Sequence, residues 1–103
     1  MGHELRNLHD AIVAYLTSST LRDRFTVGFN PETSRWVISI EKLSESEFND
    51  TFNVSSRLGL DPTQWDVGGI SEERHRTIRI AGLASTQARD FARAVAAHFQ
   101  GRA

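Results

Sequence analysis

The sequence contains no cysteine, which excludes a disulfide framework and any metal site built from thiolates. No hydrophobic run approaches the length that a membrane-spanning helix needs. The first residues, Met1 to Arg6, lack the continuous apolar stretch of a signal peptide. From these absences we expect a cytoplasmic protein that does not contact a membrane.

The chain also lacks an excess of charge of one sign. It has 12 Lys and Arg against 13 Asp and Glu, for a net charge of −1. Proteins that bind nucleic acids usually carry a positive excess, so this balance disfavours nucleic acid as the main partner. The length of 103 residues, with 39% hydrophobic and 24% charged residues, predicts a single folded domain over 1–103 with its own core.

Hydrophobic spacing predicts an N-terminal helix at about 4–17, with one apolar stripe formed by Leu5, Leu8, Ile12 and Leu16. A strand–strand–helix unit at about 24–59 follows. Its strands are indicated by alternating apolar residues on both sides of a turn at 30–34. Its helix is predicted to begin at a capping box formed by Ser44 and Glu47, and to end at Gly59. We expect its apolar face to consist of Phe48, Phe52, Val54 and Leu58.

A second strand–strand–helix unit is predicted at about 64–100. Trp65 and Val67 alternate with polar residues, as do Ile78 and Ile80, and Ser85 or Thr86 starts a third helix. The buried stripe of this helix is predicted to be Ala88, Phe91, Ala92, Val95 and Phe99.

The two units align without a gap when the chain is shifted by forty residues, which pairs Val27 with Val67 and Ile38 with Ile78. Internal duplication and convergence on a common motif both explain this match. Either predicts an α+β fold in the order α-β-β-α-β-β-α. Two hairpins would form a four-stranded antiparallel sheet, with the helices packed mainly on one face.

This order of elements is similar in topology to the core of LAGLIDADG homing endonucleases. In that family the first helix ends in an acidic metal ligand, whereas Leu16, Thr17 and Ser18 occupy that place here. The order is also similar to that of small type III secretion chaperones. That resemblance implies a dimer that binds unstructured protein partners.

The sequence lacks a recognisable catalytic constellation. Gly68 and Gly69 are not followed by a helix, as a phosphate-binding loop would require, and no strand–Ser–helix elbow occurs. The four histidines lie apart in the sequence and are interpreted as solvent-facing, so we expect no metal and no cofactor. Asp66 and His75 could form an acid–base pair, which leaves a small hydrolase or nuclease as an alternative. We favour a protein that is not an enzyme.

The densest positive cluster is predicted at and after the second turn, where it comprises Arg74, His75, Arg76 and Arg79. It could contact a phosphate backbone or an acidic partner, although Glu72 and Glu73 offset its charge. Nucleic-acid binding through this hairpin is therefore a further alternative.

The face of the sheet turned away from the helices is expected to carry small residues, with Val37 and Ser39 among them. It offers no aromatic platform on which nucleic-acid bases could stack. Such a face suits contact with another protein. We therefore favour a protein-binding module, such as an accessory, inhibitor or chaperone-like factor, that forms a homodimer. The predicted partner-binding residues are Arg74, His75, Arg76, Arg79, Val37 and Ser39.

Overall fold

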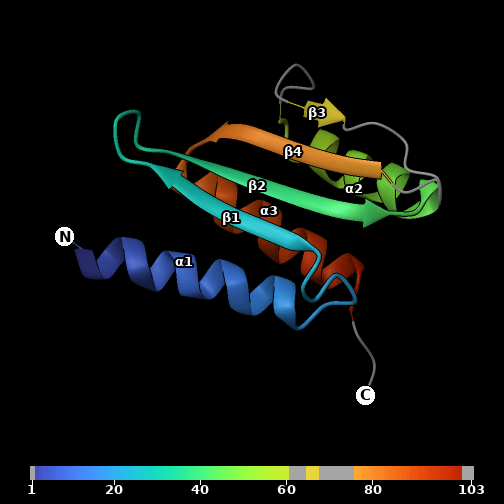
Figure 1. Ribbon diagram of the computed structural model, residues 1–103, viewed down its shortest axis with the longest axis horizontal. Helices are drawn as coiled ribbons and strands as arrows, with labels where there is room; N and C mark the ends of the chain where they lie inside the picture. Colours follow the sequence, from blue (N-terminus) through green and yellow to red (C-terminus); the bar gives the residue numbers. More distant parts are fainter. Residues whose placement is uncertain (1, 61–64, 68–75, 101–103) are drawn as a thin grey trace.

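The computed structural model describes residues 2–60, 65–67 and 76–100. Its elements in chain order are α1 (Gly2–Thr17), β1 (Phe25–Asn30), β2 (Arg35–Leu43), α2 (Glu45–Arg57), β3 (Trp65–Val67), β4 (Arg76–Leu83) and α3 (Ser85–His98) (Figure 1). None of the described helices has the length and apolar character needed to cross a membrane.

The strands form an antiparallel sheet in the order β1-β2-β4-β3. β1, β2 and β4 have 6, 9 and 8 residues and make up its body, whereas β3 has only 3. The prediction of four strands in two equivalent hairpins is therefore corrected to three full strands and a three-residue edge segment. The physical reason is that the described part of β3 forms only three residue pairs with β4, whereas β1 forms six with β2, so the two hairpins are not equivalent.

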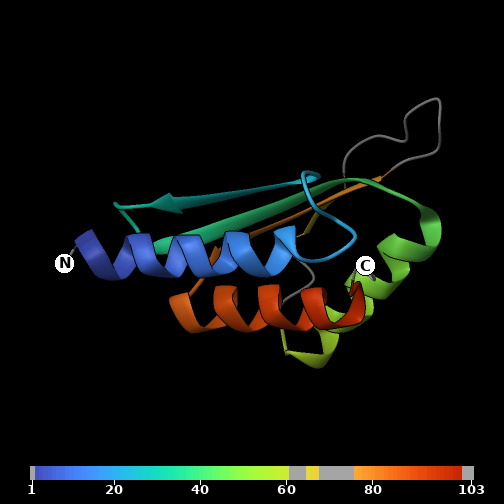
Figure 2. The same ribbon diagram turned by 90° about the horizontal axis from the view of Figure 1, so that it is seen from below.

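The helices lie together on one face of the sheet, as Figure 2 shows. The core between the two layers is formed by apolar side chains that are at most 1% exposed. They include Trp36, Ile38 and Ile40 of β2, Ile78 and Ile80 of β4, Ile12 and Leu16 of α1, and Phe91 and Val95 of α3. The alternation seen in the sequence therefore assigns the faces of β2 and β4 correctly.

The strand pairings are related by a forty-residue shift. Phe25 pairs with Ile40 in the first hairpin, and Trp65 pairs with Ile80 in the second. β2 and β4 pair symmetrically about Ser39 and Arg79, which lie opposite each other. The pairing of β2 with β4 is thus approximately two-fold symmetric about this residue pair.

Both ends of α2 confirm the capping predicted from the sequence. The hydroxyl of Ser44 accepts a hydrogen bond from the backbone N–H of Glu47 at 3.1 Å, and the Glu47 carboxylate accepts one from the Ser44 N–H at 2.9 Å. Gly59 has a φ of 73°, in the left-handed region that favours glycine. The N–H of Leu60 then donates to the carbonyl of Ser55 at 3.1 Å, which completes a Schellman motif.

The apolar face predicted for α2 is partly wrong. Phe52 and Leu58 are 36% and 40% exposed. Thr51 and Ser55 are fully buried in their place. Their hydroxyls donate to the carbonyls of Glu47 and Thr51 at 2.8 and 3.0 Å, which satisfies them within the helix. Hydroxyl side chains can therefore occupy the buried stripe, and hydrophobicity alone does not locate it.

The N-terminus of α3 is less well capped than that of α2. Ala84 occupies the N-cap position with an extended backbone, but it has no side-chain acceptor. We expect Ala84→Ser to raise the free energy of unfolding by about 1 kcal/mol, because a hydroxyl there can accept from the N–H of Gln87. Thermal melts monitored by circular dichroism would show a midpoint roughly 4–8 °C higher. Ser44→Ala is the matched control, and it should lower the midpoint by a similar amount. An unchanged midpoint in Ala84→Ser would contradict the expectation.

Candidate functional site

The face of the sheet opposite the helices is not covered by any element of the described chain (Figure 2). Val37, Ser39, Thr77 and Ala81 are half-buried on this face, and they form a small-residue centre. Thr26, Arg35 and Glu41 are exposed toward its border, and Arg79 is exposed at its centre, opposite Ser39. The middle of this surface therefore carries small side chains and one guanidinium group, with further charges of both signs toward its border. We call this surface the open sheet face.

Gly28 explains why the open sheet face is shallow at β1. It pairs with Val37, and a Cβ atom added to Gly28 would lie 3.2 Å from Cγ1 of Val37. That separation is tighter than ordinary van der Waals contact. A larger residue at this position would therefore displace the valine side chain. Glycine lets Val37 extend across the neighbouring strand.

The structure brings together three of the residues predicted as partner-binding. Val37 and Ser39 lie two residues apart on β2, and Ser39 is paired with Arg79 of β4. Arg76 lies elsewhere, because its guanidinium is 5.0 Å from the centroid of the Phe48 ring on the helix side. Arg76 and Arg79 thus occupy opposite faces of β4 and do not form one basic surface.

Two of the predicted partner-binding residues are not described by the structure. Arg74 and His75 lie outside the described residues, and so does one member of the proposed pair of Asp66 and His75. Asp66 belongs to β3, where its backbone is paired with Arg79. Among the residues that the structure describes, no group of three or more His, Asp or Glu side chains could hold a metal ion.

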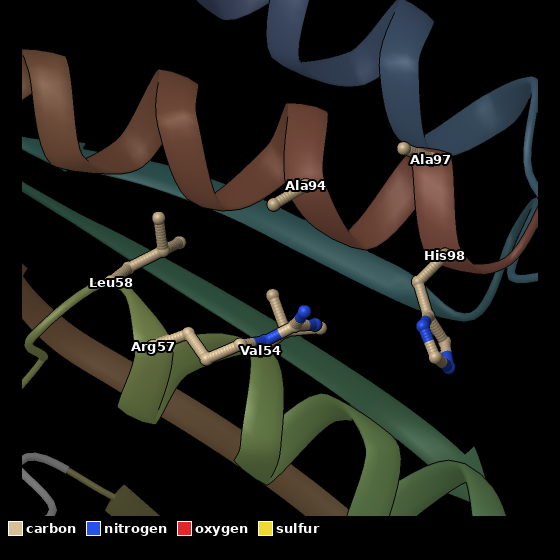
Figure 3. Close-up of a pocket in the computed structure, with 6 residues that line it drawn as sticks. All are labelled: Val54, Arg57, Leu58, Ala94, Ala97 and His98. Atoms are coloured by element: carbon tan, nitrogen blue, oxygen red, sulfur yellow. The ribbon is translucent and has the colours of Figure 1, made fainter.

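A second surface was not predicted from the sequence. α2 and α3 are separated by a groove of about 450 Å³, lined by Val54, Arg57, Leu58, Ala94, Ala97 and His98 (Figure 3). At one end, Nε2 of His98 lies 3.1 Å from Oδ2 of Asp50. His98 therefore has a carboxylate partner, contrary to the interpretation of all four histidines as merely solvent-facing. The pair joins positions 48 residues apart, and no local sequence signal could have indicated it.

Arg24 and Glu47 form the junction that fixes the start of α2 beneath the sheet. The two guanidinium nitrogens of Arg24 donate to the two carboxylate oxygens of Glu47 at 3.2 and 3.0 Å. They also donate to the carbonyls of Lys42 and Thr20 at 2.8 and 3.2 Å. The hydrogen bond from Arg24 is the main cause that lowers the pKa of Glu47, and it outweighs the opposing effect of burial. We assign this ion pair a structural role and not a chemical one, because the two side chains are hydrogen-bonded to each other.

Comparison of the chain with protein families, with curated proteins and with solved structures finds no match in any of the three.

Proposed function

We propose that this chain is a non-enzymatic protein-binding module that acts through the open sheet face and assembles there as a homodimer. The observation that carries the proposal is the placement of all three helices on one side of the sheet. The other side keeps Val37, Ser39 and Ala81 half-buried at its centre, and no described element covers them. Small side chains allow close approach of a second flat surface.

The charges of this face support a self-complementary contact. Arg79 at its centre and Glu41 toward its border are both exposed, and they carry opposite charges. A two-fold symmetric interface requires each patch to match itself, so a patch with both charges can form reciprocal ion pairs. A role as an accessory, inhibitor or chaperone-like factor in the cytoplasm is the function class that we assign to such a module.

The match at a forty-residue shift supports a further part of the proposal, namely that the two strand–strand–helix segments arose by internal duplication. The paired registers described above support it, as does the start of α2 and α3 at positions 45 and 85. The segments have since diverged, because Phe48, Thr51 and Phe52 stand opposite Ala88, Phe91 and Ala92 in the shifted alignment.

Sedimentation or light scattering at tens of micromolar protein tests the homodimer. We expect a dimer of the unaltered chain, and a monomer for Val37→Lys, because a buried, unpaired ammonium in the contact is strongly unfavourable. Asn53→Lys is the matched control, since it adds the same charge to an exposed position of α2. A monomer of the unaltered chain at these concentrations would overturn the dimer, as would a Val37→Lys dimer of unchanged affinity.

A further inference from the structure

The groove between α2 and α3 is separate from the open sheet face, because the groove lies on the helix side of the sheet and the open face lies on the other side. In Figure 3 the strands pass behind the two helices, and the groove lies between the helices in front of them. Its volume of about 450 Å³ is within the range of roughly 300–1,000 Å³ that is usual for binding sites. Two helices thus border a concave surface that the proposed function does not use.

The lining of the groove is divided along its length. Val54 is 1% exposed and forms the floor, the half-buried Ala94 borders it on α3, and the exposed Ala97 lies at its rim. Leu58 marks one end and His98 the other, and the side chain of Arg57 extends between them (Figure 3). The groove therefore has an apolar floor beside the guanidinium of Arg57, with the imidazole of His98 at one end.

The charges around the groove are not balanced within the described chain. Asp50 is engaged with His98 at 3.1 Å, and Asp90 is engaged with Arg93 at 3.1 Å. Arg57 forms no ion pair or hydrogen bond with any residue that the structure describes. Among the described residues, the positive charge of its side chain therefore has no partner beside the apolar floor.

We propose that the α2–α3 groove binds an amphipathic helix of a partner protein, with apolar residues on the face that enters the groove and carboxylates along its border. A helix laid into a hydrophobic groove places side chains at i, i+3 or i+4, and i+7 against the floor. Val54, Leu58 and the two alanines of α3 receive these side chains. The guanidinium of Arg57 pairs with a carboxylate of the bound helix, in the two-point geometry that arginine favours.

The first test uses a synthetic probe with the full-length chain. The probe is a fluorescein-labelled peptide of about 16 residues with Leu at helical spacing and Glu on the flanks, and its binding is followed by fluorescence anisotropy. We expect saturable binding that weakens with added salt, and at least roughly tenfold weaker binding of a peptide in which every Glu is Lys. Equal affinity for the two peptides, or no binding of the acidic peptide at millimolar protein, would overturn the proposal.

Two variants locate the contact. Arg57→Glu should weaken binding of the acidic peptide roughly tenfold or more and improve binding of the basic one, because it reverses the charge at the groove. Arg6→Glu is the matched control, since it makes the same change at an exposed position of α1 outside both surfaces and should leave the affinity unchanged. Ala97→Trp should block the groove by filling it, and Ala97 is exposed, so the fold tolerates a larger side chain there.

Competition by decanoate distinguishes a peptide site from a site for small amphipathic acids. We expect decanoate below its critical micelle concentration not to displace the bound peptide. Complete displacement would show that the groove binds small carboxylates, and it would overturn the proposal of a helix. Peptide binding does not depend on the homodimer. The Val37→Lys variant should therefore bind the acidic peptide with unchanged affinity, even if the dimer proposal fails. Loss of peptide binding in Val37→Lys, with its fold retained, would place the peptide on the open sheet face and overturn the assignment.

Discussion

Replacing Phe91 by alanine is expected to lower the free energy of unfolding by about 4 kcal/mol, which is the largest effect among the substitutions considered. Phe91 is 0% exposed and belongs to the cluster that joins α3 to the sheet. Removing its ring costs the transfer free energy of the lost atoms and leaves a cavity that the rigid sheet above it cannot fill. Urea denaturation monitored by circular dichroism would measure the loss as a lower midpoint at unchanged slope.

Two further variants control this measurement. Phe91→Leu keeps most of the buried volume and should lose less than half as much, which preserves a folded protein if the alanine variant unfolds. Phe52→Ala removes the same atoms from a side chain that is already 36% exposed, so its effect should also be clearly smaller. Equal losses for Phe91→Ala and Phe52→Ala would show that the core does not lie where the structure places it.

The second large effect is expected at Arg24. Its side chain, 23% exposed, joins Thr20, Lys42 and Glu47 through four hydrogen bonds of 2.8 to 3.2 Å. Arg24→Met keeps the length of the side chain but removes every donor, which leaves the carboxylate and both carbonyls without this partner. We expect a loss of about 2 kcal/mol in the free energy of unfolding, because solvent reaches part of the pair and replaces some of these bonds.

The same pair gives the protein a defined response to acid. The pKa of Glu47 is lowered from its ordinary value of 4.5, mainly by the hydrogen bond from Arg24. A carboxylate with a lowered pKa contributes its stabilisation fully above pH 4.5, and that contribution is lost as the pH falls through the folded-state pKa. Unfolding measured from pH 7 downward should therefore show a steeper loss of stability below pH 4.5 in the unaltered chain than in Glu47→Gln. Identical acid profiles would contradict this linkage.

The residues of α2 illustrate how far the sequence alone could define an element. Ser44, Glu47 and Gly59 act through the nearest few residues, so their spacing was sufficient to predict both ends of the helix. The buried stripe depends on the direction from which the sheet approaches. Thr51 and Ser55 occupy the buried positions, where their hydroxyls donate to carbonyls within the helix, and Phe52 is partly exposed.

The candidate sites show the same division. Val37 and Ser39 were assigned to one surface because side chains two residues apart on a strand share a face. The sequence places Arg76 and Arg79 in one positive cluster, because the residues before Arg76 are predicted to form a turn. β4 begins at Arg76, so a spacing of three residues places the two side chains on opposite faces.

The sequence by itself determined the caps of α2, the inward faces of β2 and β4, and the α3 stripe except for Phe99, which is only partly buried. Each of these features follows from periodicity or from contacts within one turn. Only the tertiary structure decided that three full strands carry the sheet, that Asp50 meets His98, and that Arg57 lies beside an apolar groove. These features depend on how separate elements are placed against one another. The sequence could not show either surface on which our proposals rest, because the arrangement of the layers decides which sheet face and which groove the described elements leave uncovered.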